Sequence, residues 1–477
     1  MLNLSQIPVK WLVIIILTVS IAIHFSYFSH PAETVFDEVH FGKFISGYFT
    51  GEYFFDIHPP LGKLLISGMG RLTGFEPGFD FANIGQGFPN NSYLWLRLLP
   101  ILAGTLLPLV IFLLAFKLGL SRLASFLAGI LVALDNSLLV QSRFILLDSF
   151  LLLFGFMALL FYFKYKNGLI FNTKYLILSG LFGAFAISIK WTGLTFLAII
   201  IILEAFRQFK ERRNINSYQI FGKSVIALIA LPFVVYFLVF SIHFGLLDKS
   251  GPGDAFMTPS FRKTLTGSPD ALNPDIEPLG LFGKFTELNG QMYSANARLS
   301  ATHPYSSKWY TWPFMIRPIY YWNGSAAPSD SGQDDMGQSR IYFLGNPIIW
   351  WASSVAMIFL LLVLLESILR KFYKNEINQT YSGLIPWLFT GAFMFNLLPF
   401  IGVSRVLFLY HYLSAYIFAI LTLAYLSDKL PEKTKRITVA CLILAGIASF
   451  LYFAPLSYGL SLSDASYNAR VWFASWR

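Results

Sequence analysis

Residues 93–116, YLWLRLLPILAGTLLPLVIFLLAF, form an apolar run with a single charged side chain, Arg97. A helix needs about 20 predominantly apolar residues to cross the hydrocarbon core of a bilayer, so this run predicts a transmembrane helix. Runs of the same character lie on both sides of it, at 11–28, 123–140, 144–163, 175–189, 191–206, 224–244, 347–369, 383–401, 406–426 and 437–455. The chain is therefore predicted to be an all-α polytopic membrane protein with about eleven transmembrane helices.

The composition supports a membrane protein. Of 477 residues, 56% are hydrophobic and only 13% charged, and the mean hydropathy is +0.60; a soluble domain of this size is far less apolar. The net charge of +10 comes from Lys and Arg scattered between apolar runs. This pattern favours membrane lipids over nucleic acid as the partner. Cys441 is the only cysteine, which excludes a disulfide framework or a cysteine zinc site.

Every second predicted loop is basic, as in the pairs Lys117 with Arg122 and Arg370 with Lys371. Short basic loops stay cytoplasmic, so the N-terminus is predicted inside and the C-terminus outside a plasma (inner) membrane. Two long segments, 29–92 and 245–346, then lie outside. The predicted division is an N-terminal transmembrane region at 1–244, a second outer loop at 245–346 and C-terminal helices at 347–477.

The first outer loop contains FDEVHFGKF from Phe36. An apolar stripe at helical spacing predicts an amphipathic helix on the membrane surface, formed by Phe41, Phe44, Ile45 and Tyr48. Asp37 and Glu38 open this helix. Adjacent helical positions point about 100° apart, so the two carboxylates are expected to have different roles. The alternative is that both complement the helix macrodipole.

A second surface helix is predicted after DIHPP, where Pro60 suits the first helical turn. Its apolar stripe is Leu61, Leu64, Leu65, Met69 and Leu72, and Lys63 lies off this stripe. His58 is either a ligand or base, or a structural hydrogen-bonding group.

The second outer loop predicts a third amphipathic helix with the stripe Leu281, Phe285, Leu288, Met292, Ala295 and Leu299. The following stretch, THPYSSKWYTWPFMIRPIYYW, is rich in Tyr and Trp and is typical of an interfacial aromatic belt. Its polar members His303, Lys308 and Arg317 are expected at headgroup level.

Ionisable residues at the ends of predicted helices need a partner or a function, because charges inside a bilayer are costly. These residues are Arg97, Asp135, Arg143, Asp148, Lys190 and Arg405. Arg143 is expected to pair with Asp148 or Asp135. Arg97 and Arg405 have no acid nearby in sequence, and a guanidinium at this depth suits a phosphate.

Several stretches, in order along most of the chain, resemble the protein O-mannosyltransferase family of the membrane glycosyltransferase C superfamily. They are FDEVHFGKF, GEYFFDIHPPLGKLL, LRLLPILAG, SRFILLDSF, IKWTGL, ATHPYSSKW with WPFMIRPIYYW, YFLGNPIIWW and SRVLFLYHYL. The resemblance implies inverting transfer of mannose from a polyprenyl-phosphate carrier to Ser or Thr hydroxyls of exported polypeptides, on the outer face. The family's eukaryotic members carry a MIR domain for which 245–346 is too short, so a bacterial or archaeal form is expected.

The resemblance also assigns roles to residues. Asp37 matches the catalytic acidic residue, with Glu38 beside it, and Arg97 matches the arginine that contacts the donor phosphate. Lys63 and Arg405 are further candidates for that phosphate. The remaining candidates for the site are His58, Arg143, Asp148, Lys190, His303 and His411.

Other assignments remain open from the sequence. The lipid-linked sugar is the donor and no further cofactor is firmly implied; a divalent cation at Asp37 and Glu38 is conceivable, although no set of residues has metal-ligand spacing. A dimer is an open alternative, as the family forms them. A related enzyme could glycosylate lipid A or another glycolipid. A transporter or lipid flippase is less favoured, because it needs ionisable residues at mid-membrane.

Overall fold

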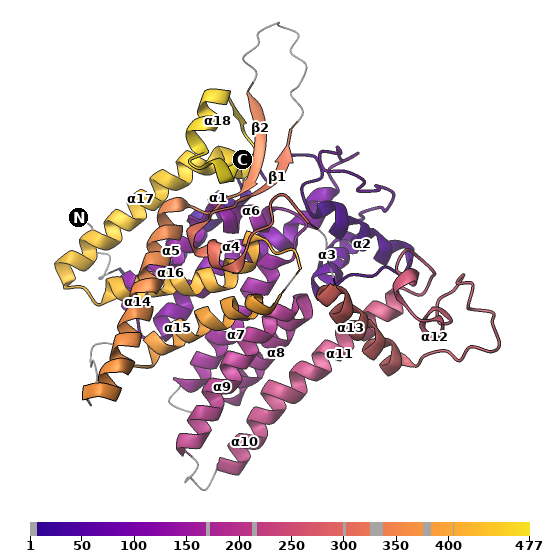
Figure 1. Cartoon of the computed structure of the whole chain (residues 1–477), viewed down its shortest axis with the longest axis horizontal. Helices are drawn as coiled ribbons and strands as arrows, with labels where there is room; N and C mark the ends of the chain where they lie inside the picture. The colour runs from indigo at the N-terminus through magenta and orange to yellow at the C-terminus, as the bar shows by residue number, and fades with distance from the viewer. Residues whose placement is uncertain are drawn as a thin grey trace, which may run out of the picture. The chain divides into compact units, whose positions relative to one another are not determined.

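A computed structural model describes residues 7–167, 172–211, 217–298, 302–324, 337–374, 383–403 and 405–477. The chain is mostly helical and divides into two compact units (Figure 1). Unit 1 comprises Met1–Pro31, Ala103–Arg143 and Thr302–Arg477, and unit 2 comprises Ala32–Leu102 and Phe144–Ala301. Both units are discontinuous in sequence. The three regions predicted from the sequence are consecutive, because they were defined by the side of the membrane on which each segment lies. The two units are defined by contacts between residues, which do not depend on that side.

Unit 2 is built around a group of long apolar helices. In Figure 1, α7 (Asp148–Lys166), α8 (Thr173–Ile189) and α9 (Leu194–Glu211) lie side by side, and α11 (Leu231–Leu246) packs on α8. A short turn, η2 (Trp191–Gly193), joins α8 to α9, and α10 (Ser217–Val225) continues through η3 (Ile226–Ala230) into α11. The smaller helices of this unit are α2 (Glu38–Thr50), α3 (Leu61–Leu72), η4 (Asp254–Phe256), α12 (Pro259–Arg262) and α13 (Leu281–Arg298).

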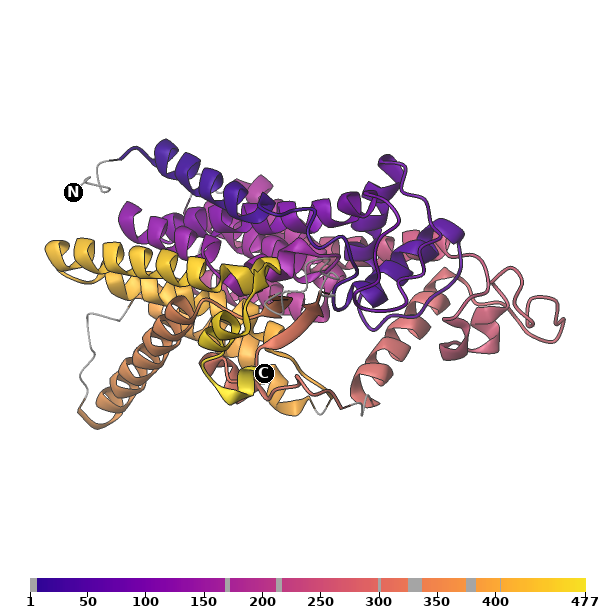
Figure 2. The ribbon, with the colours of Figure 1, turned by 90° about the horizontal axis from the view of Figure 1, so that it is seen from above.

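Unit 1 is organised around α16 (Leu413–Asp428), whose side chains are almost all buried. It packs against α5 (Arg122–Ala133), α14 (Pro347–Lys374) and α15 (Leu384–Leu397). Figure 2 shows α14 and α17 (Glu432–Tyr458) diverging toward one end. The other helices of this unit are α1 (Val9–Phe25), α6 (Asn136–Arg143), η5 (Trp309–Phe314), η7 (Leu398–Gly402), η8 (Leu409–Tyr412), α18 (Asp464–Arg470) and η9 (Ala474–Trp476). One of the boundaries between the units, that between Leu102 and Ala103, falls within α4 (Tyr93–Lys117).

The apolar helices agree with a multi-pass membrane protein. Within the described residues, eight helices are long and apolar enough to cross a bilayer, and two shorter apolar helices are Val9–Phe25 and Thr173–Ile189. The predicted span 123–140 is instead two helices, α5 and α6, bent by 54°. Asp135 explains the break: its carboxylate accepts hydrogen bonds from the Leu138 amide at 2.9 Å and the Ser137 hydroxyl at 2.5 Å, which caps the start of α6. The count of about eleven spans and their orientation stay predictions.

The segment 302–322, expected to form an aromatic belt at the membrane interface, differs from that prediction. A three-stranded antiparallel sheet contains β1 (Ile319–Asn323), β2 (Gln338–Phe343) and β3 (Ser461–Leu462), in that order. Ile319 lies opposite Phe343 in the register, with an irregularity between Tyr320 and Trp322. Several of the belt aromatics, such as Trp312 and Tyr321, are fully buried in the protein. Tyr321 packs in the core because the strand pairing turns one face of β1 inward, and Trp312 is buried from η5.

The predicted surface helices form, but the protein covers their apolar faces. In α2, Phe41, Ile45 and Tyr48 are buried, and in α13 the buried residues are Phe285, Leu288 and Met292. Leu299, the last residue of the predicted third stripe, lies outside the described residues. In α3 the buried residues are Gly62, Lys63, Ile66, Ser67 and Gly70, so the predicted stripe is not the face that packs against the protein, and Leu72 in it is 86% exposed. That this stripe lies on the membrane surface stays a prediction.

Candidate functional site

Asp37 lies at the start of α2, and its carboxylate is not bound by any of the described residues. The preceding residue, Phe36, has a φ of 45°, a left-handed conformation that costs about 1–2 kcal/mol outside glycine. The Asp37 side chain is half-buried and does not cap α2. Among the described residues it makes no hydrogen bond or ion pair. Asp37 therefore does not cap α2 through a hydrogen bond, and its carboxylate is available to another group. That Asp37 and Glu38 complement the helix macrodipole stays an alternative.

The electrostatic surroundings of Asp37 suit a base. Burial raises its pKa to about 7, the positive charge of Lys190 lowers it, and the negative charges of Asp148 and Asp56 raise it. A general base works best when its pKa lies close to the working pH. It must be ionised before the reaction and basic enough to accept a proton during it. Asp37 meets that condition near neutral pH.

Glu38, the next residue, has a different environment, as the helical geometry predicts. Its side chain is fully buried and accepts hydrogen bonds from Arg97 Nε at 2.8 Å and Arg97 Nη2 at 2.7 Å. It also accepts from the backbone amides of Val35 at 2.8 Å and Ile145 at 2.9 Å. These donors engage both carboxylate oxygens. Glu38 therefore fixes the start of α2 to two other segments of unit 2.

Arg97 is held by the same arrangement. Besides Glu38, its Nη2 donates to the Glu33 carbonyl at 2.8 Å, and the guanidinium lies 4.8 Å from the ring centroid of Tyr93 and 5.0 Å from that of Phe144. Its side chain has no solvent exposure. The acid that the local sequence lacks is supplied from α2. The role of Arg97 at a donor phosphate stays a prediction, but here its guanidinium is engaged by Glu38.

Asp148 and Lys190 form a second buried ion pair. Lys190 Nζ lies 2.8 Å and 2.9 Å from the two carboxylate oxygens of Asp148. Asp148 begins α7 and Lys190 follows the last residue of α8, and these helices pack together. The expected pairing of Asp148 with Arg143 is therefore wrong: Lys190, distant in sequence, is its partner.

Arg143, in unit 1, binds carbonyl oxygens. It donates to Ser457 at 3.0 Å and to His30 at 2.9 Å, and its guanidinium lies 4.8 Å from the ring centroid of Tyr458. Asp135 accepts from the Tyr416 hydroxyl at 2.8 Å and the Asn346 amide at 3.0 Å. Both residues thus join segments of unit 1, and neither shows the pairing expected from the sequence.

Lys63 is buried beside a small cavity of unit 2. Its ammonium pairs with Asp56 and donates to the His58 carbonyl at 2.8 Å, and burial lowers the pKa of Lys63. The cavity is lined by Phe54, Asp56, His58, Pro60, Lys63, Phe240, His243, Leu288 and Met292. Lys63 as a phosphate ligand and His58 as a ligand or base stay predictions.

Sequence reasoning missed Asp56 and His243 at this cavity. His243 is buried and its Nδ1 lies 2.7 Å from the Tyr48 hydroxyl. The sequence did carry a signal for it, since an ionisable residue within the predicted span 224–244 calls for a partner or a function. Asp56 is the first residue of DIHPP, two positions before His58, and its charge influences Asp37.

The remaining candidates belong to unit 1. The His303 ring lies 5.0 Å from that of Phe408, and its Nδ1 accepts from the Tyr305 amide at 3.1 Å. His411 Nδ1 lies 2.9 Å from the Phe408 carbonyl oxygen and 3.2 Å from the Phe408 amide nitrogen, and its ring stacks on Tyr410. Arg405 is half-buried, and burial lowers its pKa. Their roles at the site stay predictions.

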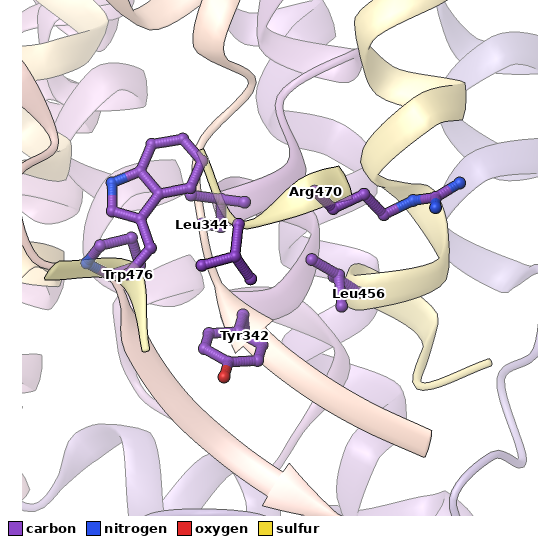
Figure 3. Close-up of a pocket in the computed structure, with 7 residues that line it drawn as sticks. Tyr342, Leu344, Leu456, Arg470 and Trp476 are labelled. Carbon is purple, nitrogen blue, oxygen red and sulfur yellow. The ribbon is translucent and has the colours of Figure 1, made fainter. Parts of the chain in front are cut away.

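Unit 1 also contains a small apolar cavity, drawn in Figure 3. It is lined by Pro318, Tyr342, Leu344, Leu456, Arg470, Val471 and Trp476. Arg470 is the charged lining residue, and its guanidinium donates to the carbonyls of Tyr452 at 2.6 Å and Ser466 at 2.7 Å. Figure 3 shows it extending away from Tyr342 and Trp476. The cavity lacks groups suited to acid-base chemistry, so the candidate site is the charged cluster of unit 2.

A metal centre gains little support from this cluster. Across the part of the chain that the structure describes, no group of three or more His, Cys, Asp and Glu side chains could hold a metal ion. Both oxygens of Glu38 are engaged by Arg97 and two backbone amides. Asp37 and Glu38 therefore do not present two free carboxylates to one cation.

Comparison with known proteins gives matches along most of the chain. Residues 14–248 match the family model for dolichyl-phosphate-mannose-protein mannosyltransferase, and residues 281–476 match that for the C-terminal four TMM region of protein-O-mannosyltransferase. The chain is 36% identical over 292 residues to dolichyl-phosphate-mannose–protein mannosyltransferase 4 of Candida albicans, covering 58% of this chain and 38% of that protein. It is 30% identical over 331 residues to protein O-mannosyltransferase 1 of Drosophila melanogaster, covering 67% and 35% respectively.

The matched part thus spans little more than a third of these curated relatives. Among solved structures, the S. cerevisiae protein O-mannosyltransferase Pmt1–Pmt2 complex bound to the sugar donor has a TM-score of 0.87 at 21% identity, covering 99% of this chain and 93% of that chain. At this identity the similarity establishes a shared fold. These matches favour a glycosyltransferase over a transporter or flippase.

Proposed function

The chain belongs to the protein O-mannosyltransferase family, and on this basis we propose that it transfers mannose from a polyprenyl-phosphate carrier to Ser and Thr hydroxyls of exported polypeptides. The observation that carries the proposal is the state of Asp37. The other acids of the cluster, Glu38, Asp148 and Asp56, are each paired with a cation. The Asp37 side chain, by contrast, has no hydrogen-bond partner among the described residues. It is also partly open to solvent.

Asp37 would act as the general base. A Ser or Thr hydroxyl is a weak nucleophile at neutral pH, so removing its proton during attack is worth about a hundredfold to ten-thousandfold in rate. The hydroxyl proton passes to the Asp37 carboxylate while its oxygen forms a bond to the anomeric carbon. The bond from that carbon to the phosphate oxygen breaks, and its electron pair leaves with the polyprenyl phosphate. Attack opposite the leaving phosphate inverts the anomeric centre.

The other charged residues would support this step. A sugar phosphodiester already carries a good leaving group, so the enzyme has to stabilise negative charge more than to donate a proton. Lys190 supplies positive charge close enough to Asp37 to lower its pKa. Glu38 is bound to Arg97 and to the Ile145 amide, and these contacts hold the start of α2, next to Asp37, in place. These residues would position the base without contacting the acceptor.

Transfer by the purified protein tests the proposal. The protein in lipid nanodiscs would be supplied with synthetic polyprenyl-phosphate mannose and with two acceptors, a Ser- and Thr-containing peptide and lipid A, and the products would be identified by mass spectrometry. We expect one hexose on a peptide hydroxyl, with none in the absence of donor. Transfer to lipid A or another glycolipid, with the peptide unmodified, would support the alternative acceptor. No transfer to either acceptor by a folded protein would contradict the proposed activity.

A further inference from the structure

Helix α2 carries two exposed basic side chains after Asp37. The backbone amides of His40 and Phe41 donate to the Asp37 carbonyl at 2.9 Å and 3.0 Å, so Asp37 stands at the first turn of the helix. His40 follows about one turn later and Lys43 almost two turns later. Both side chains are exposed, and neither makes a hydrogen bond or an ion pair with the residues that the structure describes.

The other cations expected at the site within unit 2 are each bound by a carboxylate. The three pairs are Arg97 with Glu38, Lys190 with Asp148 and Lys63 with Asp56. The side chains of these three cations are 0%, 11% and 1% exposed, respectively. Because the two charges of each pair offset one another, the pairs offer little net attraction to a further anion. His40 and Lys43 differ from them in being both exposed and not bound by an acid among the described residues.

The proposed reaction needs positive charge at a second point, away from the base. When the bond between the anomeric carbon and the phosphate oxygen breaks, a phosphodiester with one negative charge becomes a phosphate monoester, whose charge is about −1.5 to −2. Inversion places this phosphate and the attacking hydroxyl on opposite sides of the carbon. A rise of about 1.5 Å per residue offsets His40 and Lys43 from Asp37 by about 4.5 Å and 9 Å along the helix. This offset suits a phosphate that lies beyond the reacting carbon while the hydroxyl lies at the base.

We propose that Lys43 and His40 bind the phosphate of the lipid-linked donor: the Lys43 ammonium pairs with one phosphate oxygen, and the His40 imidazole donates an N–H to another. The inference rests on the proposed function and names the residues that hold its donor. The hydroxyl proton passes to Asp37, and the electron pair of the broken bond stays on the phosphate oxygen, where these two side chains stabilise it. An imidazole has an N–H to donate in either protonation state.

A phospholipid headgroup has the same phosphodiester chemistry, so the source of the phosphate has to be argued. A helix that is held by the bilayer surface buries its apolar face in the lipid. In α2 that face, formed by Phe41, Ile45 and Tyr48, is buried in the protein instead. The two basic groups also follow the candidate base on the same short helix. Both observations favour the donor over a bilayer lipid.

The test measures the binding of radiolabelled polyprenyl-phosphate mannose to the protein in nanodiscs of zwitterionic lipid. A charge-assisted hydrogen bond corresponds to about tenfold in affinity, so Lys43→Gln should raise the Kd of the donor about tenfold. His40→Gln should raise it by a smaller factor, and Lys43→Arg, which keeps the charge, should bind nearly as tightly as the parent. Lys174→Gln is the matched control, because it removes another exposed lysine of unit 2 and should leave the Kd unchanged.

Kinetics separate phosphate binding from a structural role. Because negative charge on the phosphate grows in the transition state, Lys43→Gln should also lower kcat at saturating donor. The KM for the acceptor peptide should stay at its parental value. Added salt should weaken donor binding to the parent more than to Lys43→Gln. The thermal unfolding temperature should not change, since both side chains are exposed and make no bond within the described part of the chain.

The double variant His40→Gln/Lys43→Gln decides the outcome. A parental donor Kd in the folded double variant would overturn the proposal. If this variant kept the parental donor Kd but retained less phosphatidylglycerol than the parent in native mass spectrometry, the two residues would bind bilayer lipid, and the proposal would be wrong.

Failure of this inference can be separated from failure of the proposed function, because donor binding is measured without an acceptor. Loss of donor binding in the variants, with no peptide mannosylated by the parent, would support the phosphate site and contradict the proposed acceptor. Mannosylation by the parent, with an inactive Asp37→Asn protein and normal donor binding by the double variant, would overturn only the role of His40 and Lys43.

Discussion

Arg97 donates two hydrogen bonds to the Glu38 carboxylate, from Nε at 2.8 Å and from Nη2 at 2.7 Å, and neither side chain is exposed. The pair joins the start of α2 to α4, and Glu38 also binds the amide of Ile145. Next to it, Asp37 makes no such bond among the described residues. Of the two neighbouring carboxylates in this motif, Glu38 therefore has a structural role and Asp37 is the candidate base.

Removal of Arg97 should destabilise the protein. Arg97→Ala leaves the Glu38 carboxylate buried without its cation, which costs about 3–5 kcal/mol in the free energy of unfolding. We expect a lower thermal unfolding temperature and a lower folded yield, measured by fluorescence-detected size exclusion. Glu38→Gln combined with Arg97→Gln removes both charges and should recover part of the loss. A phosphate ligand would behave differently: Arg97→Ala would fold normally and transfer about tenfold to a hundredfold more slowly.

Activity should depend on pH through Asp37. Burial raises its pKa to about 7, and a base works only in its ionised form. The rate is therefore expected to rise with pH through about 7 and to level off above it. Below that pH the ionised fraction falls about tenfold per unit. The measurement is kcat/KM from pH 5.5 to 8.5 at constant ionic strength. A profile that is flat over this range would argue against an Asp37 base.

The orientation in the membrane is open to chemical labelling. In a Cys441→Ala background, which removes the exposed native cysteine, Leu272→Cys and Tyr218→Cys place single thiols at positions 93% and 88% exposed. Basic loops on the cytoplasmic side predict that only the variant at position 272 reacts with an impermeant maleimide in intact cells. The variant at position 218 should react after permeabilisation. The reverse result would place the candidate site on the cytoplasmic face.

The helices could be predicted because their signal is local. The apolar runs predicted to start at Tyr93 and Pro347 correspond to α4 and α14, and both helices begin at those residues. The break at Asp135 escaped prediction, since its capping hydrogen bonds do not interrupt the hydropathy of the run. The small sheet was missed for another reason: β1 is a short aromatic strand, and its partners β2 and β3 come from later parts of the chain.

The partners of the charged residues could not be predicted from local sequence. The expectation that Asp37 and Glu38 differ follows from helical geometry, and the structure agrees with it. Arg97 and Lys190, however, find their acids 59 and 42 residues away along the chain. Such pairs form only when helices pack together. The prediction relied on closeness along the chain and therefore paired Asp148 with Arg143 by mistake.

The most direct test of the central claim compares Asp37→Asn with Glu38→Gln in the peptide mannosylation assay. Asp37→Asn removes the base while keeping the size of the side chain. The predicted result is a protein with parental thermal stability that binds the lipid-linked mannose but transfers it at least a hundredfold more slowly. Glu38→Gln should instead lose thermal stability, because Glu38 binds Arg97. Transfer at the parental rate by Asp37→Asn, with a stable but inactive Glu38→Gln protein, would contradict the assignment of Asp37 as the base.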